Sequence, residues 1–86
     1  MARRYAPTVA HLRLFASARE AAGTARDTID GDTVGDVLDA AVRRFGPDFG
    51  AILDSSRVWC NGEPARPGDP VGEGDEIAVL PPVSGG

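Results

Sequence analysis

Residues 32–47, DTVGDVLDAAVRRFGP, have the strongest hydrophobic periodicity in the chain. Apolar side chains recur there at intervals of three and four residues, which places them on one stripe of a helix. The stripe comprises Val34, Val37, Leu38, Ala41, Val42 and Phe45. Asp32 or Thr33 can cap the start, Thr33 with Asp36 resembles a capping box, and Gly46 then Pro47 is typical of a helix end. A single amphipathic helix cannot bury its stripe alone, so another layer of structure must cover it.

Short segments of alternating polarity predict that this layer is a sheet. The expected strands are residues 8–16, 24–30, 56–63 and 76–80. Their expected inward side chains are Ala10, Leu12, Leu14, Ile29, Val58, Cys60, Ile77 and Val79. Asn61-Gly62 is a strong hairpin-turn dipeptide. Residues 17–23 predict a short helical turn or loop that ends at Gly23, and residues 48–53 are too short for more than one turn of helix or a packed loop.

The order strand, strand, helix, strand, strand favours one helix packed across one face of a small mixed sheet. Parallel pairing is then expected between the strands that flank the helix or between the first and last strands. This ββαββ arrangement is the ubiquitin-like β-grasp, an α+β fold. At 86 residues the chain is one domain with no room for a large internal active-site cavity. We expect the domain to span residues 1–80 and a flexible tail to span residues 81–86.

Composition excludes several classes of function. The net charge is −4, and the basic residues are scattered arginines, which argues against nucleic-acid binding. No lysine is present, so the chain cannot accept a lysine isopeptide bond on its own side chains. Cys60 is the only cysteine, which excludes an internal disulfide and favours a reducing compartment. No secretory signal or 18-residue apolar run is found, so we expect a cytoplasmic protein with no membrane contact.

The side chains offer no self-contained active site. His11 is the only histidine, and without a second positioned group it is better interpreted as a surface residue than as a base. Cys60 alternates onto the apolar face with Val58, which favours a buried structural thiol over a nucleophile. The serines have no nearby histidine or nucleophile-elbow motif. Whether the chain is an enzyme therefore stays open.

The C-terminal residues VLPPVSGG leave a terminal carboxylate as the best remaining reactive group. A frayed terminus is the plain alternative. Pro81 and Pro82 fix φ and favour an extended path away from the last strand. Gly85 and Gly86 have no Cβ, so the chain there can bend and pass through a narrow channel.

These residues resemble the MoaD/ThiS family of sulfur carriers, and most closely the small subunit of molybdopterin synthase. The resemblance extends along the chain through LRLFASAREAAGT (12–24), GDTVGDVL (31–38), VWCNGEPA (58–65) and VGEGDEIAVLPPVSGG (71–86). It implies that an E1-like adenylyltransferase uses ATP to adenylate the Gly86 carboxylate. A sulfurtransferase or another sulfur source then leaves a thiocarboxylate on Gly86, and Gly85 permits passage of the tail.

The same resemblance implies that the large subunit of molybdopterin synthase receives the tail and uses its sulfur to make the dithiolene of the molybdenum cofactor. No cofactor is expected on the chain itself. The expected partner-binding residues are Phe15, Trp59, Leu80, Pro81, Pro82, Val83 and Ser84. Phe15, Trp59 and Leu80 can equally belong to the core, and Trp59 is bulkier than the family pattern leads us to expect.

Three other functions remain open on the sequence. The first is a carrier of the same type that serves thiamine, cysteine or thiosugar biosynthesis. The second is a ubiquitin-like modifier that is conjugated to target lysines. The third is a plain β-grasp interaction domain with an idle tail.

Overall fold

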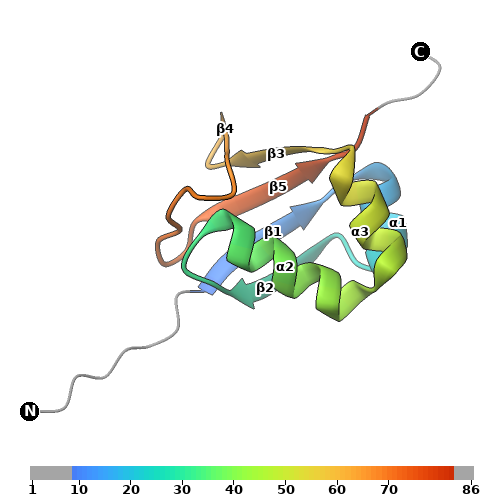
Figure 1. Ribbon diagram of the computed structural model, residues 1–86, viewed down its shortest axis with the longest axis horizontal. Coiled ribbons are helices and arrows are strands. Elements are labelled where there is room, and N and C mark those ends of the chain that lie inside the picture. Colours follow the sequence, from blue (N-terminus) through green and yellow to red (C-terminus); the bar gives the residue numbers. More distant parts are fainter. Residues whose placement is uncertain (1–8, 83–86) are drawn as a thin grey trace, which may run out of the picture.

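The computed structural model describes residues 9–82 of the chain, and its central feature is a five-stranded mixed sheet (Figure 1). The strands are β1 (Val9–Leu14), β2 (Arg26–Asp30), β3 (Arg57–Cys60), β4 (Glu63–Pro64) and β5 (Glu76–Leu80). Their order across the sheet is β2-β1-β5-β3-β4. Within this part of the chain no helix is long and apolar enough to span a membrane.

The first and last strands lie side by side at the centre of the sheet. β1 and β5 run parallel, with Leu12 opposite Ile77 and Leu14 opposite Val79. The other pairs, β1 with β2, β3 with β5 and β3 with β4, are antiparallel. Parallel pairing of the first and last strands was one of the two options that the sequence left open.

All three helices of the described residues cover the same face of the sheet (Figure 1). They are α1 (Ala16–Ala22), α2 (Val34–Phe45) and α3 (Pro47–Asp54). The Thr33 side chain caps α2 by accepting a hydrogen bond from the Asp36 N–H at 3.1 Å, and Thr33 is one of the two caps that the sequence allowed. Gly23 ends α1 in the left-handed conformation, with φ of 78°. α2 lies over the sheet, while α1 and α3 gather where β1 and β5 end.

The expectation for residues 48–53 was wrong, because α3 is a helix of eight residues. Gly46 ends α2 and at the same time precedes α3, with a φ of 101° that favours glycine. Pro47 does not only stop α2: it occupies the first turn of α3, where its missing N–H costs nothing. Phe49 on α3 is fully buried, although no sequence pattern predicted it as a core residue.

The core lies between the helices and the inner face of the sheet. The predicted inward positions of β1 and β5 are buried, as are Ile29 and the α2 residues Val34, Val37, Leu38 and Ala41. Val58 and Cys60 lie on the inner face but are only half-buried. Asn61 and Gly62 make the predicted turn, both with positive φ, 53° and 85°. β4 follows this turn as a separate strand, which the sequence did not distinguish from β3.

The opposite face of the sheet has no helix over it among the described residues. Side chains that alternate with the core positions point to this open face. They are Val9, His11 and Arg13 of β1, Arg26, Thr28 and Asp30 of β2, Glu76, Ala78 and Leu80 of β5, Arg57 and Trp59 of β3, and Pro64 of β4. We call this surface the open face.

Candidate functional site

The chain leaves the sheet beside two exposed apolar side chains. Because Leu14 lies opposite Val79, the next residues, Phe15 and Leu80, come together at the same end of β1 and β5. Phe15 is 39% exposed and Leu80 is 36% exposed, which makes them the large hydrophobic side chains most open to solvent in the described chain. We call this pair the Phe15–Leu80 patch. An exposed apolar pair at this point fits contact with another protein.

Local backbone geometry holds Phe15 in this exposed position. Its carbonyl oxygen accepts hydrogen bonds from the N–H groups of Ala18 and Arg19 at the start of α1. Ala16 adopts a left-handed conformation, with φ of 51°, and so turns the chain sharply from β1 into α1. The guanidinium carbon of Arg13 lies 5.5 Å from the centre of the Phe15 ring, a cation–π arrangement.

The predicted tail residues begin directly after this patch. Pro81 is half-buried and Pro82 is exposed, and neither belongs to a helix or strand. Val83, Ser84, Gly85 and Gly86 lie outside the described residues. The roles predicted for these tail residues stay predictions.

Trp59 lies on the open face, as its alternation with Cys60 predicted. It is paired with Ala78 on one side and Pro64 on the other, is half-buried, and does not belong to the core cluster. Trp59 and Leu80 therefore share one face of the sheet. The sequence left open whether Phe15, Leu80 and Trp59 are core or surface, and the structure places all three outside the core.

The other candidate reactive groups are not assembled into a site. His11 is exposed on the open face, and no cluster of His, Cys, Asp or Glu within residues 9–82 could hold a metal ion. Burial raises the pKa of the Cys60 thiol, and the negative charges of Asp75 and Asp69 raise it further. A raised pKa keeps the thiol protonated at neutral pH, which disfavours a nucleophilic role.

The turn before β5 is held by a carboxylate that the sequence analysis did not single out. Asp75 Oδ2 accepts a hydrogen bond from the Gly72 N–H at 2.7 Å. The Asp75 carbonyl oxygen accepts from the His11 N–H, and Asn61 Oδ1 accepts from the Glu76 N–H. These bonds fix the residue at which β5 starts, and they therefore determine the position of Leu80 at its end. The Gly72 N–H, followed by the Asn61 side chain, lowers the pKa of Asp75.

We predict that this turn makes stability depend on pH through Asp75. A carboxyl with a lowered pKa in the folded state stabilises the protein above its unfolded pKa, near pH 4, and loses that contribution as the pH falls through the folded pKa. Asp75→Asn keeps an oxygen for the Gly72 N–H but removes the charge. In urea unfolding, the variant should have a lower midpoint than wild type at pH 7, and the difference between the two midpoints should shrink as the pH falls below the unfolded pKa and through the folded pKa. A difference that stays the same throughout the acid titration would exclude the ionised carboxylate as its source.

Over residues 9–82, a mixed sheet with its first and last strands parallel at the centre and the helices on one face defines the ubiquitin-like β-grasp fold. Comparison with solved structures agrees. The chain superposes on the crystal structure of SAMP1 from Haloferax volcanii with a TM-score of 0.82 at 38% identity, covering 91% of this chain and 99% of that one. A chain from the complex of subunits 1 and 2 of the molybdopterin-converting factor of Helicobacter pylori gives a TM-score of 0.69 at 21% identity, over 92% of this chain and all of that one. The same fold therefore occurs in a protein that assembles with a partner subunit.

The chain belongs to the ThiS family, whose pattern it matches over residues 12–86. It is 48% identical over 85 residues to small archaeal modifier protein 1 of Haloferax volcanii, covering 86% of this chain and 97% of that protein. It is 39% identical over 82 residues to the molybdopterin synthase sulfur carrier subunit of Drosophila erecta, covering 88% of this chain and 89% of that protein. The relatives thus comprise a sulfur carrier subunit and a small archaeal modifier protein, and the family match confirms the predicted family.

Proposed function

We propose that the chain is a sulfur carrier whose Gly86 carboxyl is adenylated and converted to a thiocarboxylate, and that it donates this sulfur as the small subunit of molybdopterin synthase. The observation that supports this most is the exit of the chain. A central strand, β5, runs directly into Pro81 and Pro82 beside the exposed Phe15–Leu80 patch. A partner docked on that patch would be close to the path of the tail.

The proposed chemistry explains why a partner enzyme is needed. A free carboxylate is ionised at neutral pH and is a poor electrophile. An E1-like adenylyltransferase would join the Gly86 carboxylate to the α-phosphate of ATP and release pyrophosphate. Hydrosulfide, present as the free ion or released from the persulfide of a sulfurtransferase by a thiol reductant that is oxidised to a disulfide, would then attack the carbonyl carbon. The C–S bond forms as the C–O bond to AMP breaks, leaving a thiocarboxylate and AMP.

The molybdopterin role is supported by the family match, which continues through the tail, and by a named relative. The Drosophila erecta protein is a molybdopterin synthase sulfur carrier subunit and aligns with most of this chain. In this role the large synthase subunit would hold the substrate, and the Gly86 thiocarboxylate would supply the sulfur.

Mass spectrometry of the intact protein tests the proposal. The full chain is incubated with an E1-like adenylyltransferase, ATP and a sulfur source, and we expect a sulfur-for-oxygen exchange at the C-terminus. Purified large subunit should then consume the thiocarboxylate and form the dithiolene product. No exchange with any E1-like enzyme would contradict the carrier function, and exchange without product formation would contradict the molybdopterin role alone.

A second candidate function is conjugation to target proteins. It is favoured by the Haloferax volcanii relative, which is named a modifier and has the higher identity. A lysine amine of a target, instead of hydrosulfide, would then attack the Gly86 adenylate, so that the C–N isopeptide bond forms as the C–O bond to AMP breaks and AMP and a proton are released. Adducts of high molecular weight that need ATP and disappear on deletion of Gly86 would support this function.

A further inference from the structure

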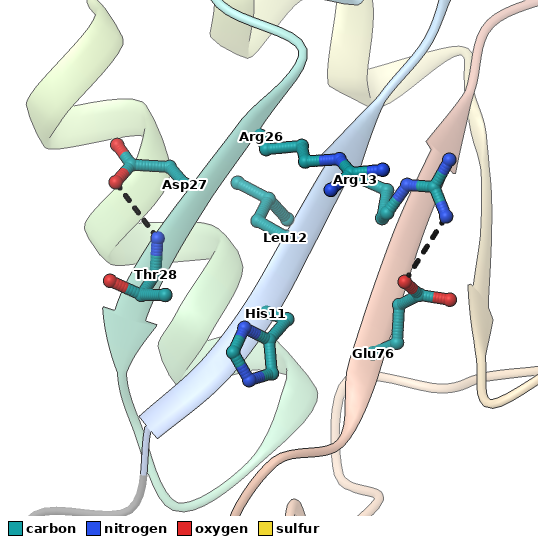
Figure 2. Close-up of a pocket in the computed structure, with 7 residues that line it drawn as sticks. All are labelled: His11, Leu12, Arg13, Arg26, Asp27, Thr28 and Glu76. Atoms are coloured by element: carbon teal, nitrogen blue, oxygen red, sulfur yellow. Dashed lines mark hydrogen bonds and ion pairs between the residues drawn. The ribbon is translucent and has the colours of Figure 1, made fainter.

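The open face has an unusual pair of charges beside the Phe15–Leu80 patch. Arg13 of β1 and Arg26 of β2 lie directly opposite each other in the antiparallel register. Like charges in this position destabilise a sheet. The two side chains line an open groove of about 390 Å³ together with His11, Leu12, Asp27, Thr28 and Glu76 (Figure 2). We call Arg13 and Arg26 the arginine pair.

Internal ion pairing satisfies only one member of the arginine pair. Arg13 Nη1 lies 3.3 Å from Glu76 Oε2. No side-chain hydrogen bond or ion pair holds the Arg26 guanidinium among residues 9–82. Figure 2 shows the Arg26 side chain extending from β2 across β1 toward Arg13, while the Arg13 guanidinium turns toward Glu76. One guanidinium is therefore left to interact with an external group.

The charge on the open face differs in sign from that of the chain as a whole. The outward charged positions of the strands are Arg13, Arg26, Arg57, Asp30 and Glu76. Three arginines against two carboxylates give these strand positions a net charge of +1, although the net charge of the chain is −4. The Asp27 carboxylate also lines the groove, but it is paired with Arg44 Nη1 at 2.8 Å. An acidic group would be attracted to this face and repelled by the rest of the surface.

The arginine pair is continuous with the apolar patch, because Arg13 stacks on the Phe15 ring at 5.5 Å. We propose that the arginine pair binds a carboxylate side chain of a protein partner that docks on the Phe15–Leu80 patch. A guanidinium presents two parallel N–H donors, which match a carboxylate bidentately. The groove is open, so the affinity for a small free anion would be low. A carboxylate on a partner that is already docked loses no further translational and rotational freedom when it binds, so the same contact is stronger there.

This inference rests on the proposed function, since the partner we name is the E1-like enzyme that adenylates the wild-type chain. The experiment follows adenylation by the release of pyrophosphate, and it measures two constants: the KM of the enzyme for the chain and its KM for ATP. Arg26→Gln should raise the KM for the chain on the order of tenfold and Arg26→Glu about a hundredfold, with kcat unchanged. The KM of wild type should rise with salt more steeply than that of Arg26→Gln.

The effect of Arg26→Glu on the stability of the fold should have the opposite sign to its effect on docking, so a structural role of Arg26 would not explain weaker docking. Glutamate at this position would face Arg13 and replace a repulsive cross-strand pair with an attractive one. The urea midpoint of Arg26→Glu should therefore equal or exceed that of wild type, while its docking is impaired. Weaker docking in a variant of undiminished stability supports a contact with the partner.

Arg43→Glu, an exposed change on α2, is the matched control and should leave the KM for the chain within about twofold. If Arg43→Glu and Arg26→Glu raise the KM for the chain equally, the inference is overturned, because docking would then depend only on the overall charge of the chain. If the Arg26 variants raise only the KM for ATP, the inference is also overturned, because the arginine pair would then bind a phosphate and not a carboxylate of the partner. If Phe15→Ala raises the KM for the chain and Arg26→Glu does not, this inference fails and the proposed function stands. If no E1-like enzyme adenylates wild type, both fail.

Discussion

An alanine added after Gly86 is expected to abolish thiocarboxylate formation and sulfur transfer completely. One more residue moves the terminal carboxylate by about 3.5 Å and places a Cβ next to the reacting carbonyl. The carbonyl and its nucleophile must approach within about 3–3.5 Å, and a displacement of 1 Å can cost about a hundredfold in rate. Mass spectrometry of the extended protein after incubation with the E1-like enzyme, ATP and a sulfur source measures the effect.

The matched control is the same alanine added before Met1, which should leave the sulfur exchange at the wild-type level. Both extended proteins should unfold at the urea midpoint of wild type, because neither change touches a core residue. A thiocarboxylate that forms on the added alanine at the wild-type rate would contradict the need for glycine at the terminus. If the protein with the added C-terminal alanine keeps the wild-type activity in the cell, the alternative of a plain β-grasp interaction domain with an idle tail is favoured.

The sequence predicted those parts of the fold that depend on local periodicity. Ala10, Leu12, Leu14, Ile77 and Val79 alternate along single strands, and each is buried as expected. The α2 stripe likewise follows from residues within four positions of one another. The parallel pairing of β1 with β5 could be proposed only as one of two options, because it joins segments about 65 residues apart in the chain.

The prediction for α3 failed for a physical reason that is specific to Pro47. A proline after a glycine is typical of a helix end, and it is also favoured in the first turn of a new helix. Sequence alone did not reveal that Pro47 does both. Phe49 was consequently missed, since its burial depends on how α3 packs against α1 and α2 rather than on a pattern within residues 47–54.

The candidate site could be predicted in part. Leu80 and the two prolines follow the last strand, so their place at the exit of the chain is a local property. The repulsive contact between Arg13 and Arg26 depends on the register between two strands, which no local pattern reveals. One signal was nevertheless available: Arg13 and Phe15 are two residues apart within the strand expected over residues 8–16, and this spacing predicts both on the same face.

Phe49→Ala is expected to cost about 3–5 kcal/mol of unfolding free energy, the largest effect on stability that we predict. The Phe49 side chain is fully buried and its ring meets that of Phe45 edge-to-face, with centroids 5.2 Å apart. A domain of 86 residues has a total stability of about 4–13 kcal/mol, so the variant would lose a large part of it. Urea unfolding followed by circular dichroism measures the change.

Two further variants show whether this loss comes from the buried ring. Phe49→Leu refills part of the cavity and should recover about half of the loss. Phe45→Ala removes a ring that is only half-buried and should cost less than Phe49→Ala. An equal cost for the two alanine variants would contradict the core role of Phe49. Phe49→Ala should also lower sulfur transfer in proportion to the fraction unfolded, whereas the C-terminal alanine should abolish transfer in a protein that is fully folded. This contrast separates the support of the fold by α3 from the chemistry proposed for Gly86.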